Sequence, residues 1–246
     1  MTSPEIPESH PRYESLLTRH RIETGVDLGI TSKQGLIAQG RGEAFDYLLG
    51  EETIPSADSA ERAAAAHLLR AERPVISVNG NVAALAPGEA VELAEATGAD
   101  LEINLFNRTR GRMERIADHL REHGAESVKG LTADSRIPGI DHERAKVDAD
   151  GIGAADVVLV PLEDGDRAEA LAEMGKTELV VDLNPLSRSA RTATVPIVDN
   201  LLRALPNMTA HAEALAGAAP ETLDSIVESF DSDAALEAAE DRIRDA

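Results

Sequence analysis

The sequence PVISVNGN at residues 74–81 marks the point where the chain changes character. Its first five residues form a short apolar run with β-branched side chains, which is typical of a buried strand. Similar runs follow at residues 100–105, 157–160, 178–181 and 195–198, and a weaker one at residues 127–129. Each of these runs has a length that suits one strand of a sheet.

Helical stretches separate the apolar runs. Amphipathic spacing is visible over residues 89–97, 110–123 and 167–174. Strands that alternate with helices pair in parallel, because each crossover helix returns the chain to the edge of the sheet where it started. The sequence therefore predicts an α/β fold with a Rossmann-like parallel sheet flanked by helices.

Residues 1–73 are predicted to form an N-terminal helical part. Its first helix is expected to end at Gly25, its second to run from a cap at Thr31 or Ser32 to Gly50, and its third to cover residues 59–72. Gly40 and Gly42 flank Arg41 inside the second helix, where each glycine costs ~1 kcal/mol relative to alanine. Either the backbone approaches another group closely there, or the helix breaks into two.

The rest of the chain is divided into the α/β domain at residues 74–210 and an acidic tail at residues 211–246, all within one compact unit. The tail holds ten acidic residues and only two arginines, so it predicts one or two solvated helices. Residues 131–151 break the alternation of strands and helices. That polar stretch is too long for a routine connection and is a candidate functional loop.

Acidic residues outnumber basic ones by 45 to 24, which gives a formal net charge of −21. The acids are spread along the chain, so a solvated shell suited to a very salty cytoplasm is favoured over an acidic interaction surface. Only four residues are lysines, which fits the same halophilic habit. No basic run is visible, and this argues against a nucleic-acid partner.

Several classes of protein are excluded by what the sequence lacks. Without cysteine there is no disulfide, thiolate catalyst or zinc–thiolate site. The first thirty residues do not resemble a signal peptide, and no run approaches the ~20 apolar residues of a membrane span. We therefore expect a soluble cytoplasmic protein without a membrane partner. The seven histidines are scattered, and His119 with His123 is expected to be a solvated pair rather than a zinc site.

Ligands of open parallel sheets bind at the carboxyl ends of the strands. After the first strand, Asn79 and Asn81 flank Gly80 and suit either a ligand or a simple turn. After the second, Arg108 stands near a helix start and suits a phosphate or carboxylate, or plain solvent. After the third, Asp164 and Asp166 could hold Mg²⁺ through water or cap the next helix.

The fourth strand is followed by the most informative loop, DLNPLSRSAR at residues 182–191. Asp182 at the strand end could bind ribose hydroxyls or a metal. The donors Asn184, Arg188 and Ser189 are crowded into this short stretch, which suits a polyphosphate. The chain has neither a P-loop nor a GxGxxG turn after its first strand, so a Walker-type or dinucleotide enzyme is not indicated.

A longer, ordered set of motifs points to a family. It comprises HPRY at 10–13, QGLI at 34–37, GRGEAFDYL at 40–48, VISVNGN at 75–81, NLF at 104–106, IPG at 137–139, HERAKV at 142–147, VVLVPLEDGDR at 157–167 and DLNPLSRSAR at 182–191. Together these segments resemble the archaeal phosphopantothenate synthetases, or 4-phosphopantoate–β-alanine ligases. The resemblance runs from about residue 10 to about residue 205.

The resemblance implies a homodimeric enzyme that joins 4-phosphopantoate to β-alanine with ATP, on the way to coenzyme A, and releases AMP and diphosphate. It places the ATP contacts on Arg19, Arg41, Asp182, Leu183, Asn184, Arg188, Ser189, Asp199 and Asn200. An ADP-forming ligase, or a nucleotide-binding regulatory module without turnover, stays open as an alternative.

Roles in the reaction follow as hypotheses. Arg188 and Arg41 are expected to stabilise phosphate charge together with Mg²⁺, and Lys33 is a further candidate. Asn79 or Asn81 is expected to hold the reacting carboxylate. The candidates for the phosphate of 4-phosphopantoate are Arg108, Arg144 and Lys146.

Overall fold

The computed structural model describes residues 7, 9–10, 12–162 and 165–246. Five parallel strands form the sheet, in the order β2-β1-β5-β6-β7. They are β1 (Pro74–Val78), β2 (Asp100–Ile103), β5 (Val157–Pro161), β6 (Thr177–Val181) and β7 (Val195–Ile197). The predicted Rossmann-like α/β fold is confirmed, whereas residues 127–129 contribute only an isolated bridge between Lys129 and Glu102.

Alternate strand residues face opposite sides of the sheet and enter two different cores. Ile76 and Leu159 lie in the larger core. It is covered by α3 (Pro55–Arg70), α5 (Pro87–Thr97) and α9 (Leu201–Leu215), which pack against one another. Helix α6 (Arg110–Glu122) joins this side through β2 and α5. Alanines on the buried face of α3 let it approach the sheet closely.

The smaller core lies on the other face and receives Val75 and Val158. It is closed by α7 (Gly165–Glu173), beside which lies α8 (Arg188–Thr192), and by residues 131–151. That last segment forms an antiparallel pair, β3 (Ser135–Arg136) with β4 (Lys146–Val147), and a 3₁₀ turn at Glu143–Ala145. Ile137 and Val147 of this segment are buried, so the expected polar loop is a packed part of the fold.

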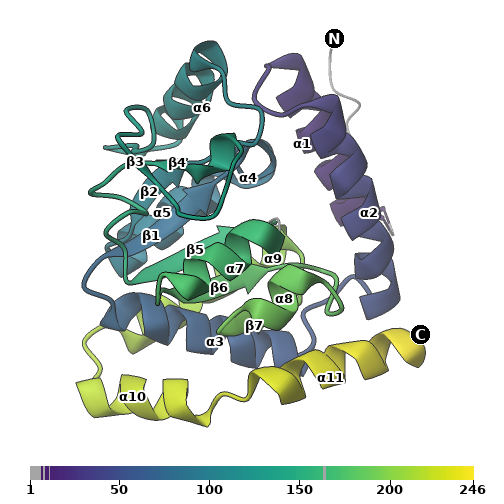
Figure 1. Cartoon of the computed structure of the whole chain (residues 1–246). Coiled ribbons are helices and arrows are strands. Elements are labelled where there is room, and N and C mark those ends of the chain that lie inside the picture. Colours follow the sequence, from purple (N-terminus) through teal and green to yellow (C-terminus); the bar gives the residue numbers. More distant parts are fainter. Residues whose placement is uncertain (1–6, 8, 11, 163–164) are drawn as a thin grey trace.

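Two N-terminal helices, α1 (Tyr13–Asp27) and α2 (Lys33–Leu49), stand on the side to which the strands point (Figure 1). The expected cap Ser32 and stop Gly50 of α2 are confirmed. One detail of the prediction is wrong. Gly25 lies inside α1, where the backbone packs so closely on Ala84 that a β-carbon would not fit. α2 continues through Gly40 and Gly42, which rules out the alternative of two short helices.

The prediction missed one helix next to the first strand. Residues 79–81, interpreted as a turn or a binding loop, begin α4 (Gly80–Leu85), which packs against α1. Asn79 caps this helix, because its Oδ1 accepts hydrogen bonds from the backbone N–H groups of Asn81 and Val82 at 2.9 and 3.1 Å. A helix of six residues is too short to leave a periodic pattern in the sequence.

The acidic tail forms two helices, α10 (Pro220–Ser229) and α11 (Ser232–Arg244), as expected. Both pack against α3 at the lower side of the view in Figure 1. Leu236 and Ala239 of α11 reach a third small core that also holds Leu49 and Leu183. The division of the chain at residues 73 and 210 stays a prediction. None of the helices in the described part of the chain could span a membrane.

Candidate functional site

The candidate site lies at the carboxyl ends of the strands, where the strand order reverses between β1 and β5. Helix α2 crosses this edge of the sheet from one side to the other. Near its start, Asn81 donates from Nδ2 to the carbonyl oxygen of Gly35 at 3.0 Å. Near its end, Asp46 accepts a hydrogen bond from Asn200, which follows β7, at 2.6 Å. The helix therefore covers the strand ends as one side of the site.

Asn79 and Asn81 shape the reversal point itself. The Nδ2 of Asn79 donates to the carbonyl oxygens of Pro161 at 3.0 Å and Leu162 at 3.3 Å, which ties the end of β1 to the end of β5. Leu162 has a φ of 58°, a conformation that costs a residue with a side chain and is frequent at functional sites. The Oδ1 of Asn81 accepts from the hydroxyl of Thr31 at 2.5 Å.

These contacts occupy the polar side-chain atoms of both asparagines, so the structure gives each a positioning role. Contact of either with a reacting carboxylate stays a prediction. Lys33 is exposed at the first turn of α2, on the same side of the site.

The loop after β6 is organised by Asp182. One carboxylate oxygen accepts from the backbone N–H of Asn184 at 3.0 Å and the other from the hydroxyl of Ser187 at 2.6 Å. Burial raises the pKa of Asp182, while these hydrogen bonds and the charge of Arg41 act in the opposite direction. The sequence had placed Arg41 and residues 182–184 at the same ligand, and the structure brings them together.

The two glycines around Arg41 have different surroundings. A β-carbon on Gly42 would lie 3.4 Å from Cδ1 of the buried Leu183, so α2 lies near the β6 loop there. A β-carbon on Gly40 would meet no atom within 4 Å, and Arg41 is exposed. A β-carbon at Gly42 would make only an ordinary van der Waals contact, so neither glycine is required by a close backbone approach within the chain.

Arg188 begins α8, and its guanidinium pairs with the carboxylate of Asp166, with Glu169 at 3.7 Å. The pair is exposed on both sides. Asp166, expected as a metal ligand, is therefore engaged with an arginine, and Asp164 lies outside the described residues. Ser189, the next residue in the chain, is buried.

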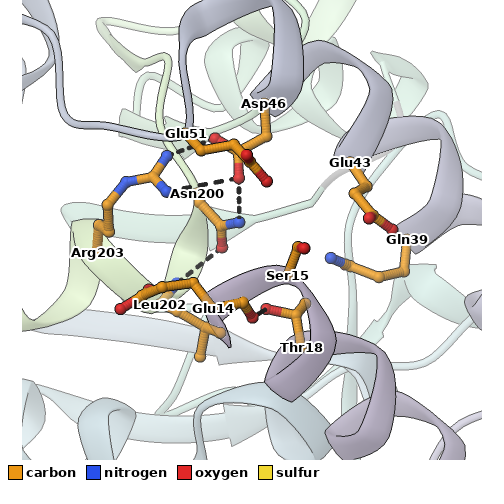
Figure 2. A pocket seen from close by; sticks show the side chains of 10 residues that line it. All are labelled: Glu14, Ser15, Thr18, Gln39, Glu43, Asp46, Glu51, Asn200, Leu202 and Arg203. Atoms are coloured by element: carbon orange, nitrogen blue, oxygen red, sulfur yellow. Dashed lines mark hydrogen bonds and ion pairs between the residues drawn. The ribbon is translucent and has the colours of Figure 1, made fainter. Parts of the chain in front are cut away.

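The edge after β7 holds a buried polar network between α2 and α9, of which Figure 2 shows Asp46, Asn200 and Arg203. Arg203 donates from Nη2 to Asp46 at 2.5 Å and to Asp199 at 2.6 Å. Asp199, which is 1% exposed, also accepts from the hydroxyl of Thr53 at 2.5 Å. Asn200 caps α9 through its Oδ1, at 3.1 Å from the backbone N–H of Leu202. The side chains of Asp199 and Asn200 thus hold α2 against the sheet.

Figure 2 also shows a small cavity beside this network, between α1 and α2. Glu14, Ser15 and Thr18 come from α1, and Gln39 and Glu43 from α2. Arg19, a predicted ATP contact, lies outside it and pairs with Glu43, at 2.9 and 3.0 Å from Nε to the two carboxylate oxygens. Its pairing raises the already high pKa of this guanidinium.

A group of basic side chains lies at the other end of the edge, after β2. Asn104 holds residues 144–146 next to the end of β2, because its Nδ2 donates to the carbonyl oxygens of Arg144 and Lys146, both at 3.1 Å. Arg108 donates from Nη2 to the carbonyl oxygen of Gly130 at 2.5 Å, and its Nη1 is buried without a hydrogen-bond partner. A buried guanidinium nitrogen without an acceptor is suited to an anionic ligand.

Further cations surround Arg108. Burial first, and then the charges of Arg115 and Arg144, lower the pKa of Arg112. A hydrogen bond from Lys146 is the largest of the effects that lower the pKa of Glu143, with contributions from Arg108 and Arg136. The predicted substrate residues Arg108, Arg144 and Lys146 therefore lie in one positive region.

Sequence reasoning missed several members of this region, and one of them is not an arginine. The ring of His142 lies 5.0 Å from the ring of Phe106, and its buried Nδ1 has no hydrogen-bond partner. Its place in the HERAKV motif was the signal that could have identified it. The edge of the sheet thus presents basic and amide groups at both ends, an arrangement that binds and orients anions rather than attacking them.

Known proteins resemble the chain over most of its length. The family described as Phosphopantothenate/pantothenate synthetase matches residues 56–246. A protein of Thermococcus kodakarensis named 4-phosphopantoate--beta-alanine ligase is 58% identical over 227 residues, which cover 92% of this chain and 87% of that protein. A protein of Methanosarcina mazei with the same name is 54% identical over 241 residues, with 98% and 95% covered.

Proposed function

The chain belongs to the phosphopantothenate/pantothenate synthetase family, and from that premise we propose that it is an ATP-dependent ligase that joins 4-phosphopantoate to β-alanine. The products are 4′-phosphopantothenate, AMP and diphosphate. The observation that carries the proposal is identity above one half, along nearly the whole chain, to proteins named for this reaction. The basic groups at the sheet edge supply the chemistry that its anionic substrates need.

The reaction has to activate a carboxylate, because an amine does not displace oxygen from a carboxylate in water. A carboxylate oxygen of 4-phosphopantoate attacks the α-phosphorus of ATP, and the bond to the β-phosphate breaks to release diphosphate. The amine of β-alanine then attacks the acyl carbon, loses its proton and displaces AMP. Positioning and neutralisation of charge are sufficient for both steps, so no protein nucleophile is required.

We place the nucleotide at the β6 end of the edge. Asp182, Leu183 and Asn184 would contact the nucleoside, and Arg41 with Arg188 and Ser189 the phosphates. For this, Arg188 exchanges Asp166 for a phosphate oxygen, an exchange that its exposed position allows. Lys33 would add charge from the start of α2.

Three further predicted ATP contacts are engaged within the protein. Asp199 and Asn200 are buried, and Arg19 pairs with Glu43. We propose that Asp199 and Asn200 act by positioning α2 and that Arg19 leaves Glu43 when the nucleotide is bound. Asn79 and Asn81 would fix the crevice where the carboxylate meets the α-phosphate.

We place the phosphate of 4-phosphopantoate at Arg108, Arg144 and Lys146. The unpartnered Nη1 of Arg108 supports this placement. The crevice at Asn79 then lies between the two anionic subsites, as the reaction requires.

Mg²⁺ is proposed only as the companion of the ATP phosphates. Among the described carboxylates at this edge, Asp166 pairs with Arg188 and both oxygens of Asp182 accept hydrogen bonds. They do not form an open cage of oxygen ligands, so they do not fit a dedicated magnesium site. No step is therefore assigned to a protein-bound metal.

A homodimer is proposed from the outer face of α2. Ile37 and Tyr47 are 66% and 73% exposed, and Leu36 and Leu48 are also exposed. Leu36 and Tyr47 are eleven residues apart, as are Ile37 and Leu48, so each pair shares one side of the helix, and the two pairs lie about 100° apart around it. We propose that a second copy of the chain covers these four side chains. Light scattering should give twice the mass of the chain, and Ile37→Glu with Tyr47→Glu should halve it.

We also propose a cytoplasmic location and a halophilic setting, on the strength of the charge of −21.

The test of the function is a chromatographic assay in molar potassium chloride with ATP, Mg²⁺, 4-phosphopantoate and β-alanine. AMP formed in equal amount with 4′-phosphopantothenate supports the ligase and the adenylate route. ADP in place of AMP keeps the ligase and rejects that route. Binding of ATP by a folded sample without either product rejects the enzyme and favours a regulatory module.

A further inference from the structure

A second cluster of ionisable side chains lies away from the edge of the sheet, between α3 and α9. Asp58 and Glu61 are one turn apart on α3, and His211 lies opposite them on α9. One potential ligand atom from each of the three lies within 4.8 Å of the others. The Nε2 of His211 is 3.0 Å from Oδ1 of Asp58. The scattered histidines of the sequence gave no sign of this meeting.

Glu61 is the unusual member, because it is 0% exposed. Its Oε2 accepts a hydrogen bond from Nδ2 of Asn207 at 3.0 Å, but its Oε1 is buried without a hydrogen-bond partner. A buried carboxylate oxygen needs a donor or a cation. Burial, and then the charge of nearby Asp199, raise the pKa of Glu61 to about 9. Either a proton, hydrogen-bonded between Glu61 and Asp199, or a metal ion satisfies this carboxylate.

We propose that Asp58, Glu61 and His211 bind one divalent transition-metal ion of the zinc type between α3 and α9. Two carboxylates and one imidazole are a mixed oxygen and nitrogen set of the kind that such ions take. Three protein ligands leave a position for water, and the site has an entrance. The side chain of Asp58 is 61% exposed and that of His211 24%, whereas Glu61 closes the inner end.

The ion has a structural role, because it joins two helices that pack on the same face of the sheet. It also ends a chain of hydrogen bonds that reaches the edge after β7. Asn207 donates to the hydroxyl of Thr53 at 3.1 Å as well as to Glu61, and Thr53 donates to Asp199. Binding therefore stabilises the part of the fold that holds α2. The proposal does not depend on the reaction proposed above.

The experiment uses the full chain after treatment with a chelator and exchange into potassium chloride. Titration calorimetry with Zn²⁺ is expected to show one ion per chain, and Co²⁺ to give a visible absorption band. The midpoint of thermal unfolding is expected to rise with either ion.

Variants locate the ion. Asp58→Asn and His211→Gln change partly exposed residues and are expected to weaken binding at least ~10-fold. Glu61→Gln keeps the size of the buried side chain and is expected to do the same. The control is His123→Gln, because His119 and His123 at the end of α6 are two neighbouring imidazoles outside the proposed site. It should leave the affinity unchanged.

Three results overturn the proposal. One is a stripped, folded protein that binds neither Zn²⁺ nor Co²⁺. Another is binding that survives His211→Gln and is lost in His123→Gln. The third comes from X-ray absorption of the zinc-loaded wild-type protein, which needs no variant to fold. It is expected to show oxygen neighbours with a single imidazole, and a spectrum without imidazole contradicts the site.

Discussion

Arg188 is the first residue of α8, and its exposed guanidinium forms ion pairs with Asp166 and Glu169. We expect Arg188→Ala to lower the rate of ligation by at least ~100-fold, because the phosphate charge that grows in the transition state loses its partner. Initial rates of AMP formation measure this.

The matched control is Arg70→Ala. That arginine pairs with Asp224 at the opposite, amino-terminal edge of the sheet, where β1 begins four residues later. It should leave the rate unchanged. A near-normal rate in Arg188→Ala would remove Arg188 from the reaction.

Arg108 is expected to recognise the phosphate of 4-phosphopantoate. Arg108→Lys keeps the charge but loses the planar fork, so KM for 4-phosphopantoate should rise ~10-fold or more while KM for ATP stays constant. Steady-state kinetics with each substrate varied in turn separates the two constants. Pantoate without its phosphate serves as the control substrate, since wild type and variant should use it equally poorly. A rise in KM for ATP instead would move Arg108 to the nucleotide.

At the scale of single residues, the structure brings the predicted side chains to the strand ends, while the role of each stays a prediction. Arg108 and Arg188 both lie after strands of the sheet, at its carboxyl edge. Asp199 and Asn200 stand at an equally suitable position, yet their polar atoms are used by Thr53, Arg203 and Asp46. Thr53 and Asp46 are far away along the chain, and Arg203, although only four residues after Asp199, also pairs with the distant Asp46, so local spacing does not reveal the network.

Arg203 on α9 is one of the side chains that hold helix α2 to the sheet. Removal of Arg203 leaves Asp46 and Asp199 as buried charges without their cation, so Arg203→Ala should lower the free energy of unfolding by about 3 kcal/mol. Urea unfolding measures the loss. Arg244→Ala removes an exposed arginine that pairs only within α11, and it should change stability by less than about 0.5 kcal/mol. Equal effects of the two variants would show that the network does not hold α2.

Glu102 on β2 fastens residues 131–151 to the sheet. Its carboxylate accepts hydrogen bonds from the backbone N–H groups of Asp148 at 3.0 Å and Ile152 at 2.6 Å. Burial is the main cause that raises its pKa to about 7, with Asp148 adding to the rise, and the hydrogen bonds and Arg167 opposing it. The charge of this carboxylate also acts on Lys176, where it opposes the lowering of the lysine pKa by burial.

The folded protein therefore keeps the proton of Glu102 at pH values where the unfolded chain has lost it. The stability that this proton contributes is complete below about pH 4.5 and declines as the pH rises through about 7. Urea unfolding of wild type should show this decline relative to Glu102→Gln, which has no proton to lose. The comparison cancels the titration of the other groups. A difference between the two proteins that does not change with pH would contradict the shift.

At the scale of elements, most long periodic segments were predictable, but the fifteen-residue helix α9 was missed, and the short elements were missed too. The five strands and α5, α6 and α7 begin and end within a few residues of their predicted limits. α4 and α8 are too short to show a period, and the two-residue strands β3 and β4 depend on each other. The end of α1 was predicted wrongly at Gly25. The sequence alone does not distinguish a glycine that is needed for close contact with Ala84 from one that ends a helix.

The whole molecule carries a net charge of −21, and exposed acids such as Glu221, Asp233 and Glu237 continue along α10 and α11. The unfolding free energy should rise with potassium chloride up to molar concentration, because the screening length falls from about 10 Å at 0.1 M to about 3 Å at 1 M. Circular dichroism during urea unfolding measures it. Sorbitol, which carries no charge, is the control and should not reproduce the effect of low concentrations of salt. Equal stability in dilute buffer and molar salt would contradict the halophilic interpretation.

At this scale the sequence predicted that the tail is helical but not where it lies. Its few buried side chains, among them Leu236 and Ala239, are too sparse to identify a partner by pattern. The packing of α10 and α11 on α3 is a contact between the two ends of the chain, which the order of elements along a sequence does not contain.

The same contact affects how the protein is made. Helix α3 leaves the ribosome early, yet the helices that cover it, α9, α10 and α11, are synthesised last. At about 5–20 residues per second, the alanine-rich face of α3 waits on the order of ten seconds for its partners. During translation, we therefore expect chaperones that bind nascent chains to bind the exposed apolar face of α3. A chain that is released before α9, α10 and α11 are synthesised cannot complete the core around α3.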